Sequence, residues 1–139
     1  VRNIWLKNRI PTKNNTMKRI IIDTNALMSI AAFNLDIFTA IQESVDFSYQ
    51  LFILDGTVDE LYKIQKEQRG KGRKAAKLAF QIIDAQNIPL IKEVGYVDDL
   101  LVEHSKKGDL ILTQDMALKK RLQKPYLTIR QKKKIIMIY

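Results

Sequence analysis

The sequence predicts an α/β fold in which a mainly parallel sheet of four to five strands lies between two layers of helices, an α/β/α sandwich. Three observations support this prediction. Short apolar runs alternate along the chain with longer stretches of helical periodicity. The apolar runs are continuous, which is typical of strands buried on both faces. No internal repeat or low-complexity linker divides the chain, so we expect one domain.

The predicted elements alternate from the first apolar run onward. Residues 18–22, KRIII, predict a buried strand. The Asp55-Gly56 pair is a turn signal after the second strand, and Thr57 to Glu60, TVDE, has the pattern of a helix capping box. The full series is a strand at 18–22, helices at 24–33 and 35–44, a strand at 50–54, helices at 57–68 and 73–85, a strand at 88–91, a helix at 96–107, a strand at 109–113, a helix at 115–124, a strand at 126–130, and either a last strand or a tail at 134–139.

Composition limits the classes of protein that the chain can represent. The absence of cysteine excludes disulfides and thiolate metal sites, and a single histidine, His104, argues against zinc. No apolar run is long enough to span a membrane, and the apolar part of residues 1–16 is too short for a signal peptide, so we expect a cytoplasmic protein. Residues 1–16 are either a basic arm or an extension without fixed structure, and residues 17–139 form the folded domain.

Basic and acidic side chains occur in alternating blocks along a chain whose net charge is +9. Residues 1–22 hold six basic and no acidic side chains, and residues 23–60 hold seven acidic and no basic ones. The blocks fit ordinary solvated faces, or a basic surface that binds a polyanion around an acidic centre. An acidic centre repels a phosphate chain unless cations neutralise it, so the second interpretation points to a divalent metal ion.

Acidic residues stand at four places where a strand or loop leads into a helix. Asp23 ends the first strand, Glu60 lies in the first turn of a helix, Asp98 and Asp99 begin another, and Asp115 precedes a fourth. In open α/β folds, ligands bind at the carboxyl ends of the strands. We therefore expect these carboxylates to converge on one pocket.

Each of these acids also has a simpler explanation. Asp23 and Asp115 could be helix N-caps, Glu60 could complete the capping box, and Asp98 and Asp99 could complement a helix dipole. Ser, Thr and Asn cap helices as readily, however, and such residues stand nearby, yet an acid is present each time. The set as a whole therefore favours a shared role.

Carboxylates that share one pocket repel one another and raise one another's pKa. A hard cation such as Mg²⁺ or Mn²⁺, which prefers oxygen ligands, removes this repulsion. Beside a basic surface it suits phosphodiester hydrolysis, because it lowers the pKa of a bound water and stabilises charge on the attacking and leaving oxygens. No Ser-His-Asp set or phosphate-binding glycine loop competes, and we expect His104 to serve packing or solvent contact.

The acidic segments, in this order, resemble the PIN domain family of nucleases. They are IIIDTN at the first strand, VDEL and VDDLL on two helices, and LTQD after the fourth strand. The resemblance extends from residue 17 to about 131, and the ending LKKRLQKPYLTIRQKKK looks most like small archaeal PIN proteins related to those of ribosomal RNA processing. It implies a PIN-like fold and a metal-dependent ribonuclease that uses Mg²⁺ or Mn²⁺.

The resemblance also implies roles for individual residues. Asp23, Glu60, Asp98 and Asp115 would be the catalytic and metal-binding carboxylates, with Asp99 as the alternative to Asp98 because the acid is doubled there.

Further residues would support the site or bind RNA. Asn25 or Thr24 would be a polar helper, and Thr113 would position Asp115 or bind the water shell of the metal. For phosphate contacts we expect the basic residues of two helices, which could otherwise form solvated faces. They are Arg73, Lys74, Lys77, Lys119, Lys120 and Arg121.

Three hypotheses follow for the function. The first is a divalent-metal-dependent endoribonuclease, either a toxin held by an antitoxin or a factor of ribosomal RNA processing, which could act as a homodimer. The second is a module with a PIN fold that binds RNA or a ribosome-assembly protein and cleaves little. The third is a phosphatase with Asp23 as nucleophile, which is disfavoured because Asn25 stands where that chemistry usually has a second acid.

Overall fold

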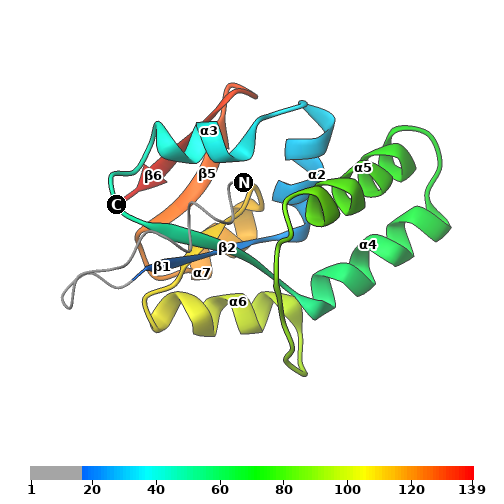
Figure 1. Ribbon diagram of the computed structural model, residues 1–139. Helices are drawn as coiled ribbons and strands as arrows, with labels where there is room; N and C mark the ends of the chain where they lie inside the picture. The colour runs from blue at the N-terminus through cyan, green and yellow to red at the C-terminus, as the bar shows by residue number, and fades with distance from the viewer. Residues whose placement is uncertain (1–16) are drawn as a thin grey trace.

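Residues 17–139 fold around a six-stranded sheet (Figure 1). This computed structural model describes these residues only, and the predicted extension 1–16 lies outside them. The strand order across the sheet is β3-β2-β1-β4-β5-β6, and every neighbouring pair is parallel except β5 and β6. The prediction of an α/β fold with a mainly parallel sheet is confirmed, but the sheet has more strands than the four to five expected.

The additional strand is formed by the end of the chain. The strands are β1 (Lys18–Ile22), β2 (Tyr49–Leu54), β3 (Leu90–Ile91), β4 (Leu110–Leu112), β5 (Tyr126–Arg130) and β6 (Lys134–Ile138). Between β5 and β6 the backbone reverses direction at Gln131 and Lys132, which both adopt positive φ angles, and the two strands then pair from Arg130 and Lys134 onward. The open choice between strand and tail for residues 134–139 is thereby decided in favour of a strand.

Helices cover both faces of the sheet. They are α2 (Thr24–Ala32), α3 (Ile37–Gln42), α4 (Asp55–Glu67), α5 (Lys71–Ala85), α6 (Val97–Lys106) and α7 (Met116–Arg121). The first four pack on one apolar core and the last two on another. Ile20 and Ile22 belong to the first core and Ile21 to the second, which explains why β1 is apolar without alternation. None of the helices within residues 17–139 has the length and apolarity needed to cross a membrane.

The chain changes direction across the sheet at β1. From β1 it runs through α2 and α3 to β2 on one side, whereas β4, which comes later, pairs with the other side of β1. The backbone N–H of Asp23 donates to the carbonyl of Leu112 (2.9 Å), so β1 and β4 end side by side. Such a point is where open α/β sheets leave a crevice for ligands.

The start of α4 differs from the prediction. The helix begins at Asp55, so the Asp55-Gly56 pair forms its first turn and is not a separate turn. A Cβ at Gly56 would lie 2.7 Å from Cγ2 of Val97, so this glycine allows α4 and α6 to approach closely. The next helix, α5, also begins earlier than Arg73, directly after Gly70, whose φ angle is positive.

Candidate active site

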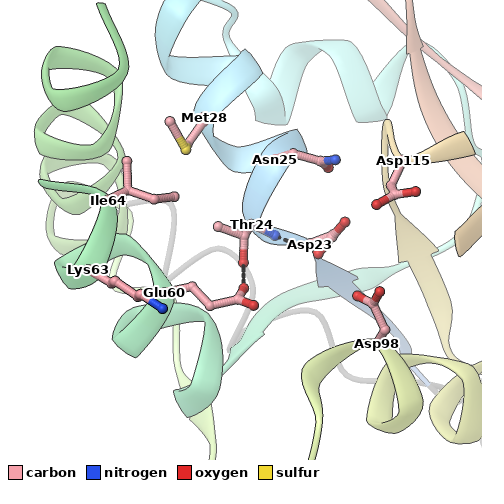
Figure 2. Close-up of a pocket in the computed structure, with 9 residues that line it drawn as sticks. All are labelled: Asp23, Thr24, Asn25, Met28, Glu60, Lys63, Ile64, Asp98 and Asp115. Atoms are coloured by element: carbon pink, nitrogen blue, oxygen red, sulfur yellow. Dashed lines mark hydrogen bonds between the residues drawn. The ribbon is translucent and has the colours of Figure 1, made fainter. Parts of the chain in front are cut away.

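A pocket of about 430 Å³ lies where helices of both layers begin, at the carboxyl edge of the sheet (Figure 2). Its walls come from α2, α4, the start of α6 and the residue before α7. The lining residues are Asp23, Thr24, Asn25, Met28, Glu60, Lys63, Ile64, Asp98 and Asp115. All four acids of the predicted set therefore line one pocket, although they are far apart in the sequence.

Asp23 is buried at the end of β1, with 5% of its surface exposed. Its carboxylate accepts hydrogen bonds from the Thr113 hydroxyl and the Thr24 backbone N–H, each 2.8 Å long. Burial raises the pKa of Asp23 to about 6, and the nearby charges of Asp98 and Glu60 add to the increase. Asp23 therefore caps α2 and also contributes a carboxylate to the pocket.

Glu60 lies one turn into α4 and points across the pocket toward α2 (Figure 2). Its carboxylate accepts a hydrogen bond from the Thr24 hydroxyl. The expected capping box is absent, because Thr57 is fully buried inside the helix and its hydroxyl has no hydrogen-bond partner among residues 17–139. The capping explanation of Glu60 is therefore wrong.

The two acids at the start of α6 have different surroundings. Asp98 lines the pocket, whereas Asp99 does not. Asp99 forms an ion pair with Arg121 of α7 (2.7 Å), and 59% of its side chain is exposed. Partial burial raises the pKa of Asp98, Asp115 adds to the increase, and Arg121 opposes it. The geometry thus favours Asp98 over Asp99 as the pocket carboxylate.

Asp115 caps α7 and is tied to Asp23 through Thr113. Its carboxylate accepts from the Leu118 N–H, and its own N–H donates to the Thr113 hydroxyl, both at 3.0 Å. Because that hydroxyl donates in turn to Asp23, one buried threonine fixes both acids. Asn25, the other expected helper, lines the pocket, and its side-chain oxygen accepts from the Gln114 N–H (3.4 Å).

Comparison with known proteins identifies the family. The family model described as a PIN-like domain matches residues 20–132. The chain belongs to the PIN-like domain family. The resemblance seen in the sequence is therefore confirmed over nearly all of the described residues.

Relatives of this PIN-like domain are found among archaeal ribonucleases. It is 28% identical over 111 residues to ribonuclease VapC9 of Archaeoglobus fulgidus, covering 78% of each chain. It is 24% identical over 123 residues to ribonuclease VapC4 of Methanocaldococcus jannaschii, covering 84% of this chain and 94% of the other. The solved structure of the PIN domain endonuclease Utp24 has the same fold, with a TM-score of 0.65 at 22% identity over 86% of this chain and 90% of that one.

The residues expected to contact RNA phosphates lie outside the pocket, and their role stays a prediction. None of the six predicted RNA-binding residues of α5 and α7 lines the pocket of the PIN-like domain, and Arg121 is engaged with Asp99. Lys63 of α4 does line it, and the sequence argument missed this residue. The signal was present, because Lys63 follows Glu60 by three residues and so shares its helix face. Met28 and Ile64 were missed because apolar residues on a helix usually indicate a core.

The donor set of the pocket fits a hard divalent cation. Its acidic wall offers carboxylate oxygens, which Mg²⁺ and Mn²⁺ prefer, and no sulfur or imidazole ligand. Among residues 17–139, no three acidic or histidine side chains lie close enough together to hold an ion as they stand. An open arrangement suits Mg²⁺, which usually keeps several waters and takes only one or two carboxylates. Asp23, Glu60, Asp98 and Asp115 are the residues that would hold it.

His104 lies outside the pocket, buried beside two acidic side chains. It is buried on α6, and its ring nitrogens lie 2.9 Å from Oδ2 of Asp109 and 2.5 Å from Oε1 of Glu93. Arg19 joins Asp109 at 3.6 Å. This histidine therefore links α6 to β4 and to the loop before α6, in line with the packing role expected for it.

Proposed function

We propose that this PIN-like domain is a divalent-metal-dependent endoribonuclease that hydrolyses phosphodiester bonds of RNA. One observation carries the proposal. Four carboxylates, supplied by the end of β1, by α4, by α6 and by the start of α7, line a single pocket at the switch point of the sheet. Capping alone does not account for this, because Glu60 and Asp98 make no cap hydrogen bond in their helices.

The relatives support the same proposal. Two archaeal relatives are named ribonucleases, and the fold neighbour Utp24 is named an endonuclease. We propose RNA as the substrate on this basis. The two biological settings expected from the sequence, a toxin that an antitoxin restrains or a factor of ribosomal RNA processing, remain part of this proposal. The possible homodimer belongs to it as well.

The residues of the pocket have different roles in the proposed reaction. Asp23, Glu60, Asp98 and Asp115 would hold the cation, and Thr113 orients Asp23 and Asp115 through its two hydrogen bonds. A bound Mg²⁺ or Mn²⁺ supplies an activated water and charge stabilisation at the phosphate. Thr24 holds Glu60 at the α2 side of the pocket. These contacts hold Asp23, Asp115 and Glu60 in place before substrate arrives, which limits the reorganisation that the reaction needs.

The alternative proposal is that the domain is a module that binds RNA or a ribosome-assembly protein and cleaves little. One observation favours this alternative: among residues 17–139, no three acidic or histidine side chains lie close enough together to hold an ion as they stand. A domain with little affinity for the cation would then retain the acids without strong activity.

A cleavage assay distinguishes the two functions. With Mg²⁺ or Mn²⁺, we expect wild-type protein to cleave labelled RNA and a chelator to stop the reaction. Asp98→Asn should lower the rate by more than about 100-fold, since the loss of residues that merely support metal ligands already costs about 10- to 100-fold. Asp99→Asn is the matched control, because its carboxylate lies outside the pocket, and it should keep most of the activity.

Equal cleavage by wild type and Asp98→Asn would contradict the proposed site. RNA binding by wild type without any cleavage, under all metal conditions, would instead support the binding module.

A further inference from the structure

The pocket has two ends of different chemistry (Figure 2). The carboxylates of Asp98 and Asp115 lie at one end, where α6 and α7 begin. Met28, Lys63 and Ile64 lie at the opposite end, between α2 and α4. A site for a metal ion alone needs oxygen ligands and has no use for this second end.

We propose that Met28, Lys63 and Ile64, the lysine end of the pocket, form a subsite for the nucleotide next to the scissile phosphate. Lys63 would contact a phosphate, and Met28 and Ile64 would contact the sugar and base. The inference rests on the proposed nuclease function, because the acidic end is taken as the position of the scissile phosphate.

The position of Lys63 supports a contact with phosphate. The side chain is exposed and lies on the same face of α4 as Glu60 (Figure 2). Among residues 17–139, no carboxylate lies within ion-pairing distance of its ammonium group, in contrast to Arg121, which Asp99 engages. A lysine left without a protein partner beside carboxylates can bind a phosphate as a point charge.

The apolar wall supports contact with the organic part of a nucleotide. Met28 and Ile64 are partly buried and pack against the larger of the two cores, the one beneath α2, α3, α4 and α5. One side of each side chain therefore contacts this core, and the other side lines the pocket. Small-molecule sites combine such apolar walls with a few placed polar groups. The volume of about 430 Å³ also lies within the range of such sites, roughly 300–1,000 Å³.

The order of the groups matches the order along a nucleic acid chain. Figure 2 shows Thr24 and Glu60 between the acidic end and the lysine end, joined by their hydrogen bond. A strand whose scissile phosphate lies at the acids would pass this pair and place its neighbouring nucleotide at Lys63. In this arrangement the acids act on the scissile phosphate, and the lysine end holds the neighbouring nucleotide and so positions the strand.

Binding of adenosine and of adenosine 5′- or 3′-monophosphate tests the subsite without any cleavage. These probes contain no bond between nucleotides, so the result does not depend on nuclease activity. With labelled methionine methyl groups and Mg²⁺ at constant concentration, we expect the probes to shift the NMR signal of Met28. A monophosphate should bind up to about fivefold more tightly than adenosine, as an exposed ion pair allows.

The variant Lys63→Gln should reduce the difference between monophosphate and adenosine. Lys66→Gln is the matched control, because Lys66 is an exposed lysine on the same helix outside the pocket, and it should keep the difference. The signal of Met137 on β6 should stay unchanged throughout. An unmoved Met28 signal with every probe, or an unchanged difference in Lys63→Gln, would overturn the subsite.

The two proposals fail separately. Protein that binds monophosphate through Lys63 but does not cleave RNA would contradict the nuclease and retain the subsite. Protein that cleaves RNA through the four acids but shows no binding that depends on Lys63 would do the reverse.

Discussion

The buried carboxylate of Asp23 links the stability of the protein to pH. Its pKa is about 6 in the folded protein and 3.8 in the ordinary reference state. Between these values the folded protein keeps a proton that the unfolded chain has released, so the free energy of unfolding falls as pH rises from 3.8 to 6. The raised pKa corresponds to about 3 kcal/mol, which the metal-free protein loses in full above pH 6.

Substitution of Asp23 by Asn tests this linkage. The amide keeps an oxygen for capping α2 and carries no charge, so Asp23→Asn in the presence of chelator should be more stable than wild type by about 2–3 kcal/mol above the folded pKa. Below the ordinary pKa of Asp the advantage should vanish. Urea unfolding below pH 3.8 and above pH 6 measures the difference in the free energy of unfolding. Asp99→Asn is the control, because the Asp99 side chain is exposed. An advantage that is independent of pH would contradict the role of ionisation.

Thr113 supports the pocket through a single hydroxyl group. The change Thr113→Val removes the donor to Asp23 and the acceptor of the Asp115 N–H. Because the Thr113 hydrogen bond lowers the pKa of Asp23, that pKa should rise in the variant. The free energy of unfolding should fall by about 1–3 kcal/mol, the usual cost of a buried group left without a partner.

An NMR titration of the Asp23 carboxyl carbon and a urea unfolding curve measure the two effects. Thr57→Val is the matched control, because the Thr57 hydroxyl is buried without a hydrogen-bond partner among residues 17–139, and its loss should cost little or add stability. If both variants lose the same stability, packing rather than the hydrogen bonds would account for the effect.

At the scale of elements, α4 and α6 approach each other closely at Gly56 and Val97. Gly56→Ala introduces a Cβ at 2.7 Å from Val97, directly before Asp98. Alanine gains up to about 1 kcal/mol in helix propensity, but overpacking costs about 1–3 kcal/mol, so we expect a net loss of stability. The helices should also move apart, which separates Glu60 from Asp98 and lowers RNA cleavage.

The double variant Gly56→Ala/Val97→Ala tests the cause. Removal of the Val97 methyl groups makes room for the new Cβ, so the two substitutions should cost less together than the sum of their separate costs. Unfolding curves and cleavage rates are measured for wild type, the two single variants and the double variant, which together form a double-mutant cycle. Strictly additive losses would show that the steric contact is not responsible.

The sequence predicted the elements well where a single rule governs them. Continuous apolar runs identified β1 and β4, and the strand ends pointed to Asp23 and Asp115. Capping and a pocket role were alternatives for these two acids in the sequence, and in the structure each acid has both. The start of α4 was misjudged because Asp-Gly favours turns by local propensity, whereas here the pair forms the first turn of the helix, where glycine leaves room for Val97. The Asp99–Arg121 ion pair depends on a contact between distant segments, which the local pattern does not contain. Lys63, in contrast, could have been found from its spacing of three residues to Glu60 on the same helix.

At the scale of the whole molecule, the distribution of charge predicts how RNA binding responds to salt. If Lys74 and Lys77 of α5 contact phosphates, Lys74→Gln/Lys77→Gln should reduce the slope of log affinity against log salt by about 1.4, at about 0.7 for each contact with a single strand. The matched control is Lys106→Gln/Lys107→Gln, which removes the same charge. These lysines lie at the C-terminal end of α6, and Asp98 lies at its N-terminal end. Equal slopes for the two variants would contradict a specific role for α5.

The acids of the pocket are supplied from both helical layers. Glu60 comes from the layer built on the larger core, and Asp98 and Asp115 come from the layer built on the smaller one, with Asp23 in the sheet between them. A chain in which only one layer has formed cannot assemble the set. If the domain is a nuclease, a nascent or partly unfolded chain is therefore unable to cut RNA, and cleavage begins only when folding of both layers is complete.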